Sequence, residues 1–150
     1  MLKRIRINSA RESDIPLIKL LLGELVEVVE DTNGFDLEQS VINIRELMKD
    51  PDHCMLVARD QSQILGLISF SNRKTILHPG PSGLIDELVV AKTSRGSGIG
   101  KQLTLAAVNK CRELGCCEVE VSTEKSNKRA RKFYGTLGFD ESGVLLELDL

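Results

Sequence analysis

The sequence predicts an α/β protein of the α+β type, with one mixed sheet flanked by about four helices. Two strand-length apolar runs in the middle of the chain are typical of an antiparallel hairpin, whereas the following elements have the order strand, helix, strand. No internal repeat and no linker interrupts the 150 residues. We therefore expect a single domain over residues 1–150.

The first third of the chain is expected to form a strand and two helices. Isoleucines alternate with arginines over residues 3–8, as in a half-buried strand. Apolar residues then recur at helical spacing from about residue 15 to Glu30. After a turn at residues 31–34, a second helix is predicted, and Asp50 and Pro51 end it.

The middle third is expected to form three strands. Residues 54–59 and 64–70 are apolar runs of strand length, separated by the polar residues 60–63, and they predict a hairpin. Residues 78–83 contain two prolines and two glycines, which no regular element tolerates. Residues 84–90 then form the next strand.

The last third is expected to alternate between helix and strand. A helix over residues 99–114 leads into a strand over 117–121, where valines alternate with glutamates. A further helix over residues 127–137 stops at a glycine. Residues 144–150 alternate weakly and predict a final strand beside residues 117–121.

Composition argues against several classes of partner. The formal net charge of −2 gives no broad electrostatic footprint for nucleic acid. No apolar run approaches the roughly 20 residues that span a bilayer, and residues 1–7 do not resemble a signal peptide. We expect a cytoplasmic protein that binds neither nucleic acid nor membrane.

The four cysteines do not predict a metal site. Cys111, Cys116 and Cys117 lie close together, but their spacing is not C-x-x-C, and both histidines are remote in sequence. They are better explained as thiols that stay reduced and mostly buried. We expect no metal.

A glycine-rich segment over residues 95–100 lies between a predicted strand and a predicted helix. Gly96, Gly98 and Gly100 permit positive φ angles and close approach, and the start of a helix carries about half a positive charge. The segment therefore predicts a site for an anion such as a pyrophosphate, although such glycines also occur in simple tight turns.

Two common phosphate-binding motifs do not fit this segment. A dinucleotide fingerprint needs a third glycine where Lys101 stands. A P-loop needs a glycine where Arg95 stands and a hydroxyl where Gln102 stands.

The pattern R-x-x-G-x-G over residues 95–100 resembles motif A of the GNAT acetyltransferases, which binds the pyrophosphate of CoA. A second pattern over residues 127–139, N-x-x-A-x-x-F-Y-x-x-x-G-F, resembles motif B of the same family. Residues 5–22 and 85–90 are similar to its opening strand and helix and to its fourth strand. The resemblance thus covers nearly the whole chain.

The resemblance implies a mostly antiparallel sheet that is splayed between its fourth and fifth strands, with acetyl-CoA bound in the opening. Its pantetheine arm would pair with strand backbone like an added strand. The cofactor contacts that this implies are Leu88, Val89, Val90, Arg95, Gly96, Ser97, Gly98, Ile99, Gly100, Lys101, Asn127 and Tyr134. Asn127 has two open roles, a contact to the cofactor arm and a helix cap.

The implied reaction is direct attack of an amine on the acetyl group within a ternary complex. An alkyl ammonium with a pKa near 10.4 must lose a proton before it attacks. Glu87 is favoured as the base, with Asp86 or water as alternatives, because neighbouring strand residues point to opposite faces and one should reach the cleft. Both carboxylates could instead be ordinary surface groups. Tyr134 occupies the family's general-acid position, unless it is a packed core aromatic.

The acceptor is the least specified part of the hypothesis. It is expected to be a small-molecule or peptide amine, and the acidic residues of segment 24–38 would suit a cationic amine unless they form an ordinary solvated face. A non-catalytic acyl-CoA-binding or sensing module with the same fold is the alternative function. A homodimer is expected from the resemblance alone.

Overall fold

The computed structural model describes residues 4–26 and 35–150. The chain divides into two compact units, residues 1–120 and 121–150. The single domain expected over residues 1–150 stays a prediction. Among the described residues, no helix combines the length and the apolar character needed to cross a membrane.

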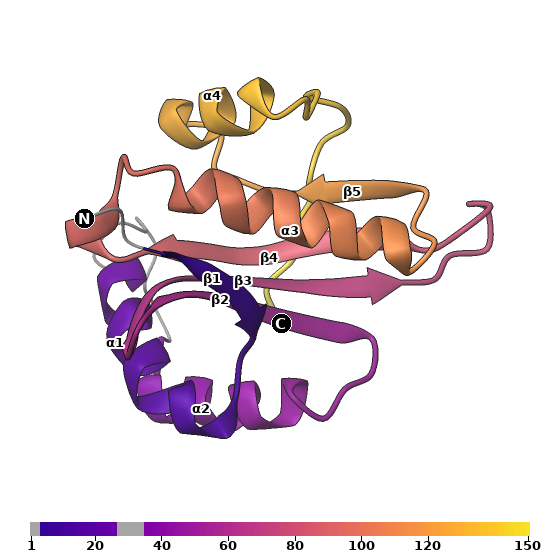
Figure 1. Ribbon diagram of the computed structural model, residues 1–150. Coiled ribbons are helices and arrows are strands. Elements are labelled where there is room, and N and C mark those ends of the chain that lie inside the picture. Colours follow the sequence, from indigo (N-terminus) through magenta and orange to yellow (C-terminus); the bar gives the residue numbers. More distant parts are fainter. Residues whose placement is uncertain (1–3, 27–34) are drawn as a thin grey trace. The chain divides into compact units, whose positions relative to one another are not determined.

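A five-stranded sheet forms the centre of the first unit (Figure 1), and its spatial order is the order in sequence. The first four strands pair antiparallel, and β5 runs parallel to β4, so the predicted mixed sheet is confirmed. The strands are β1 (Arg6–Ser9), β2 (His53–Asp60), β3 (Gln63–Arg73), β4 (Ser82–Val90) and β5 (Glu118–Val121).

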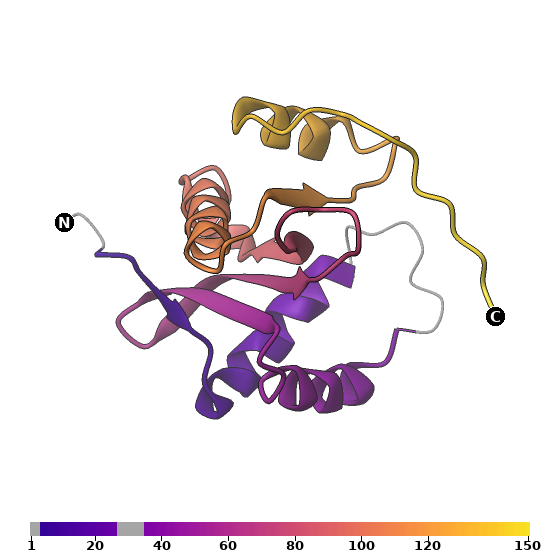
Figure 2. The same ribbon diagram turned by 90° about the vertical axis from the view of Figure 1, so that its right-hand side faces the viewer.

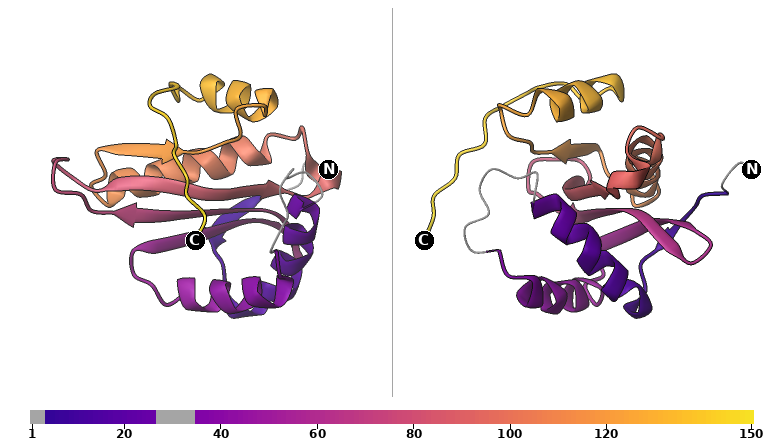
Figure 3. Two further views of the ribbon diagram at one scale, coloured as in Figure 1. Left: turned by 180° about the vertical axis from the view of Figure 1, so that it is seen from behind. Right: turned by 90° about the vertical axis from the view of Figure 1, so that its left-hand side faces the viewer.

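Helices cover both faces of this sheet. α1 and α2 pack on one face and α3 packs on the other (Figure 2), as the views from behind and from the left-hand side also show (Figure 3). Short 3-10 turns precede α1 and α3, and α4 belongs to the second unit. The helices are α1 (Ile15–Val26), α2 (Leu37–Leu47), α3 (Ile99–Glu113) and α4 (Lys128–Thr136).

Strand alternation decides which side chains enter the core beneath α1 and α2. Met55, Val57, Leu67 and Val89 lie on the same face of β2, β3 and β4 and pack with buried residues of the two helices. On the opposite face, a Cβ at Gly66 would lie 2.9 Å from Leu103 of α3, so the glycine lets α3 approach the sheet.

A β-bulge interrupts the pairing of β3 and β4. Ser69 lies opposite Glu87, and the next residue, Phe70, lies opposite Ile85, so Asp86 is the extra residue. A bulge bends its strand and changes the direction of nearby side chains. The expectation that Asp86 and Glu87 point to opposite faces assumed regular strand alternation. Because the bulge interrupts this alternation at Asp86, the assumption does not hold here.

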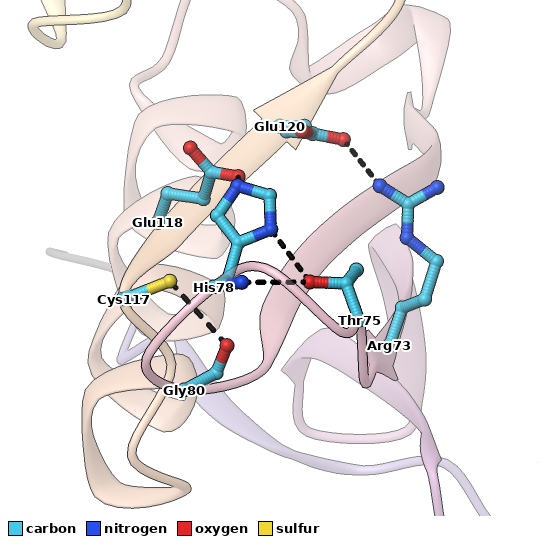
Figure 4. A network of polar contacts seen from close by, with 7 residues as sticks. All are labelled: Arg73, Thr75, His78, Gly80, Cys117, Glu118 and Glu120. Atoms are coloured by element: carbon cyan, nitrogen blue, oxygen red, sulfur yellow. Dashed lines mark hydrogen bonds and ion pairs between the residues drawn. The ribbon is translucent and has the colours of Figure 1, made fainter.

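The segment between β3 and β4 is tied to β5 by polar contacts (Figure 4). Arg73 forms an ion pair with Glu120 at 3.0 Å, and His78 Nε2 lies 3.1 Å from Glu118 Oε1. Thr75 Oγ1 and His78 Nδ1 are 2.6 Å apart. These contacts hold a long, exposed connection against the edge strand.

The predicted final strand over residues 144–150 is wrong. These residues, all described, form no strand, and Val144, Leu146 and Leu148 are each at least 85% exposed. An alternating pattern becomes a strand only when a neighbour completes its hydrogen bonds.

The expectation of mostly buried thiols holds only in part. Cys111 is buried, and burial raises its pKa to about 12, which keeps the thiol protonated. Cys117, however, is exposed, because it precedes β5 at the surface. The predicted extension of the first helix to Glu30 falls in part on residues outside the described range.

Candidate active site

The glycine-rich segment leads directly into α3, as its sequence predicted. Gly96 and Gly98 have φ angles of 78° and 85°, which favour glycine, and Gly98 is the N-cap of α3. A Cβ at either position would meet nothing within 4 Å. Among the described residues, no side chain caps the helix, whose start therefore keeps backbone N–H groups available for an anion.

The polar side chains of this segment mainly hold its shape. Arg95 Nε donates to the carbonyl oxygen of Val90 at 3.1 Å, and the Ser97 hydroxyl donates to the carbonyl oxygen of Ser94. Ile99 is 2% exposed and anchors the first turn of α3 in the core. Lys101 is exposed on the first turn and lies near the available N–H groups.

The second half of β4 lies beyond the reach of β5. The Cys117 N–H donates to the carbonyl oxygen of Pro81 at 2.9 Å, so β5 begins beside the start of β4. β5 has four residues and β4 has nine. The strand backbone from Leu88 to Val90 therefore lies past the end of β5, where a peptide-like arm could pair with it.

Two carboxylates lie on β4 at the bulge. Burial raises the pKa of Glu87, and a hydrogen bond from Ser69 opposes that shift. Burial also raises the pKa of Asp86, against the attraction of His53. Both residues keep solvent-accessible surface, so each carboxylate lies in a partly desolvated but open place. This is the environment expected of a general base that works near neutral pH.

Two further polar residues, Ser69 and His53, lie next to Glu87 on the neighbouring strands and were not predicted from the sequence. Ser69 on β3 lies opposite Glu87, and its hydroxyl oxygen is 2.8 Å from His53 Nε2 on β2. A serine inside the apolar run of residues 64–70 was the available signal in the sequence. Only the strand register shows that it lies beside Glu87.

The motif B residues lie in the second unit. The ring of Tyr134 packs edge-on against Phe133 and Phe139, with centroids 5.0 and 5.5 Å away. Burial raises the pKa of Tyr134, so its hydroxyl stays protonated and able to donate at neutral pH. Asn127 Oδ1 accepts from the Ala130 N–H at 3.0 Å, which establishes its role as a helix cap.

The acidic residues that were expected to attract a cation have other partners where they are described. Glu24 accepts from the Lys92 N–H at 2.7 Å, and Glu38 forms an ion pair with Lys19. The Asp36 carboxylate caps α2. Glu27, Glu30 and Asp31 lie outside the described residues.

A pocket of about 250 Å³ lies elsewhere, in the connection between β3 and β4, and is lined by Lys74, Thr75, His78, Pro79, Gly80 and Pro81. This connection precedes β4, whereas the glycine-rich segment follows it. The pocket is therefore at the opposite end of the strand from the predicted cofactor site.

The comparison with known families agrees with both motifs. The model of the acetyltransferase (GNAT) family matches residues 18–139, which include the glycine-rich segment, Glu87 and Tyr134. The chain belongs to the GNAT acetyltransferase family. The predicted family and fold class are thus confirmed.

Relatives of the chain are named as N-acetyltransferases. The aminoalkylphosphonate N-acetyltransferase of Salmonella typhimurium is 32% identical over 136 residues, or 91% of this chain and 85% of the relative. An N-alpha-acetyltransferase of Arabidopsis thaliana is 47% identical over 57 residues, but these make up 38% of this chain and 30% of the relative.

A solved structure is similar to this chain in its fold. An aminoglycoside acetyltransferase from an uncultured soil metagenomic sample has a TM-score of 0.80 and 25% identity, with 97% of this chain and 96% of that chain covered. The GNAT fold therefore extends over almost all of the sequence.

Proposed function

We propose that the protein is an acetyl-CoA-dependent N-acetyltransferase that acetylates a primary amine by direct attack within a ternary complex. One observation carries the proposal: β4 bears Glu87 and leads, behind two positive-φ glycines, into a helix N-terminus that no described side chain caps. A base and an anion site on the same strand–loop–helix unit are what transfer from an acyl-CoA to an amine requires.

The residues present fit acetyl-CoA, which supplies an activated acetyl group as a thioester. The N–H groups from Gly98 onward would bind its diphosphate, because the helix start favours negative charge. Lys101 would add a positive charge. Backbone groups from Leu88 to Val90 would bind the pantetheine arm, and the Asn127 side-chain amide would remain free to donate while its oxygen caps α4.

Glu87 is the proposed general base. An ammonium must lose its proton before its nitrogen can attack, and the raised pKa of Glu87 brings its basicity closer to neutral pH than that of an ordinary glutamate. Asp86 and a water molecule are the alternatives. Asp86 also has a raised pKa, but it is the extra residue of the bulge, and Ser69 does not lower its pKa as it lowers the pKa of Glu87.

Tyr134 is the proposed general acid. Its raised pKa keeps the hydroxyl proton in place at neutral pH, and the flanking rings of Phe133 and Phe139 restrict its ring. A phenol in this state donates its proton only when a stronger base, such as a departing thiolate, develops beside it.

The proposed acceptor is a small primary amine. The name of the Salmonella relative, which covers most of this chain, favours an aminoalkylphosphonate. The acidic segment 24–38 provides weaker support for a cationic amine, because Glu24, Asp36 and Glu38 have structural partners. A peptide amine is the alternative acceptor, because another relative is named as an N-alpha-acetyltransferase.

An acceptor panel tests the proposal. Release of free CoA from acetyl-CoA would be measured with aminoalkylphosphonates, polyamines and peptides with free N-termini. Turnover with one class confirms the reaction and names the acceptor. Tight acetyl-CoA binding without turnover on any amine would instead favour the non-catalytic sensing module.

A further inference from the structure

A line of polar side chains crosses the face of the sheet that α1 and α2 cover. Leu67, Val89 and Met55 form the apolar core of this face. Side chains two residues apart on a strand lie on the same face of the sheet. Ser69 follows Leu67 by two residues on β3 and lies opposite Glu87 of β4. His53 precedes Met55 by two residues on β2, so it lies on this face as well.

Ser69 lies between the other two members of the line. It is paired with Glu87 across the strands and lowers the pKa of the Glu87 carboxyl, as a hydroxyl donor does, and Ser69 Oγ lies 2.8 Å from His53 Nε2. Ser69 is 3% exposed, whereas His53 is half-buried. A buried hydroxyl thus joins a carboxylate and an imidazole that come from strands on either side of it.

We propose that Ser69 and His53 are positioning residues that orient Glu87 and conduct the proton it accepts to solvent, a role that rests on the proposed acetyltransferase function. A buried serine with a purely structural role needs one hydrogen-bond partner for its hydroxyl, such as a backbone carbonyl. Ser69 instead lies between two ionisable groups, opposite Glu87 and within hydrogen-bond distance of His53, which is the arrangement through which a proton can pass.

The proton balance is complete without another reactant. An N–H bond of the substrate ammonium breaks and an O–H bond forms on Glu87. Once Glu87 is neutral, the ring proton of His53 moves from Nε2 to Nδ1 by exchange with solvent, and the Ser69 hydroxyl turns to donate to Nε2. The Glu87 proton then passes to Ser69 Oγ as the hydroxyl proton of Ser69 passes to Nε2. The imidazolium loses its Nδ1 proton to solvent, so one proton leaves the amine, one reaches water, and the resting tautomer with a proton on Nε2 is restored.

The charges around His53 favour onward release. Burial lowers the pKa of His53, so an imidazolium formed there is unstable and gives up its proton readily. Asp86 and Asp50 oppose this shift, and Asp86 also acts on Glu87. Asp86 therefore lies where it can influence both ends of the line through its charge alone.

The first test reads the hydrogen bonds without any turnover. The chain has two histidines, so a His78→Gln background leaves His53 as the only imidazole in nitrogen NMR spectra. With Glu87 ionised, Ser69 donates to it and accepts from His53, so Nε2 should carry the ring proton. In Glu87→Met the Ser69 hydroxyl is released to donate to Nε2, and the ring proton should move to Nδ1.

Two control variants make this measurement specific. Asp86→Asn removes a nearby charge but no member of the line and should leave the tautomer unchanged. Ser69→Ala should make the His53 tautomer insensitive to Glu87→Met. Identical Nε2 and Nδ1 shifts in the His78→Gln background with and without Glu87→Met would overturn the proposal, whatever the acetyltransferase assays show.

The second test uses turnover. Ser69→Ala should lower kcat roughly 10- to 100-fold, below the full contribution of a general base. It should also move the acidic limb of the pH profile upward, because the hydrogen bond that lowers the pKa of Glu87 is lost. The KM for acetyl-CoA should change little.

Variants of His53 separate proton transfer from packing. His53→Gln keeps a polar group beside Ser69 but cannot be protonated, so it should lose kcat like Ser69→Ala. His53→Ala should regain activity as imidazole is added. Full activity of His53→Gln would overturn the proposed proton relay. If wild type itself had no acetyltransferase activity, the proposed function would be refuted, and the NMR test alone would decide whether the three side chains are coupled.

Discussion

At the scale of single residues, the proposed chemistry depends on groups whose burial suits them to opposite tasks. Burial raises the pKa of both Glu87 and Tyr134. For a carboxyl group a raised pKa means greater basicity, and for a phenol it preserves the proton at neutral pH. One physical effect thus suits the first to accept a proton and the second to donate one.

Glu87→Gln should lower kcat about 10²- to 10⁴-fold near pH 7, the usual contribution of general base catalysis. The loss should shrink as pH approaches the pKa of the substrate amine, because a neutral amine needs no base. A pH series of initial rates measures this. Asp86→Asn is the matched control, and a flat loss across pH would transfer the role to Asp86 or water.

Tyr134→Phe should fold normally, because its ring contacts with Phe133 and Phe139 need no hydroxyl. Affinity for acetyl-CoA should persist while turnover falls substantially, since the departing thiolate loses its proton donor. Calorimetry and steady-state rates on one preparation give both quantities. Unchanged turnover would remove Tyr134 from the mechanism.

At the scale of elements, an ion pair joins the start of α1 to the sheet. Arg59 of β2 donates to both carboxylate oxygens of Asp14, at 3.0 and 2.8 Å, and Asp14 is 4% exposed. Asp14 also accepts from the Arg11 N–H. The hydrogen bonds from Arg59 are the main reason that the pKa of Asp14 is lowered.

Arg59→Met should reduce the free energy of unfolding by about 1.5–3 kcal/mol at pH 7, the value of a hydrogen bond to a charged group. A lowered carboxyl pKa stabilises the fold above the unfolded value near 3.9, and this stabilisation is lost as pH falls through the lower, folded pKa. The difference in free energy of unfolding between wild type and Arg59→Met should therefore become smaller below about pH 4.

Urea unfolding across this pH range gives the comparison. The ion pair between Arg45 and Glu12 is exposed on both sides, so Glu12→Gln should cost less than about 1 kcal/mol. Equal losses for Arg59→Met and Glu12→Gln would contradict the assigned importance of the buried pair.

The elements that sequence reasoning predicted correctly are those whose signals are local. α3 and α4 end near Gly115 and Gly138, which adopt φ angles of 79° and 95°, and the hairpin of β2 and β3 formed where polar residues separated two apolar runs. The bulge at Asp86 has no such signal. The bulge arises from the register of β4 against β3, which the sequence does not reveal. For the same reason the sequence could not show that Ser69 lies beside Glu87 and that His53 lies beside Ser69.

At the scale of the whole molecule, residues 144–150 suggest association. Val144, Leu146 and Leu148 are exposed side chains spaced two apart, as on one face of a strand that lacks a partner. We propose that a second copy of the chain covers them, which agrees with the homodimer expected from the family resemblance.

Light scattering after size exclusion should give the mass of a dimer. Replacing Val144, Leu146 and Leu148 together with serine should give a monomer of unchanged secondary structure. A wild-type monomer at high concentration would refute the dimer without affecting the proposed reaction.

The central claim is that the start of α3 binds the diphosphate of acetyl-CoA, and calorimetry tests it most directly. Wild type, Gly98→Glu and Gly115→Glu would each be titrated with acetyl-CoA. Both glycines have positive φ and open space around the missing Cβ, so the substitutions impose similar strain at opposite ends of α3. We predict binding by wild type and Gly115→Glu and none by Gly98→Glu. Failure of folded wild type to bind, or equal binding by all three, would contradict the account.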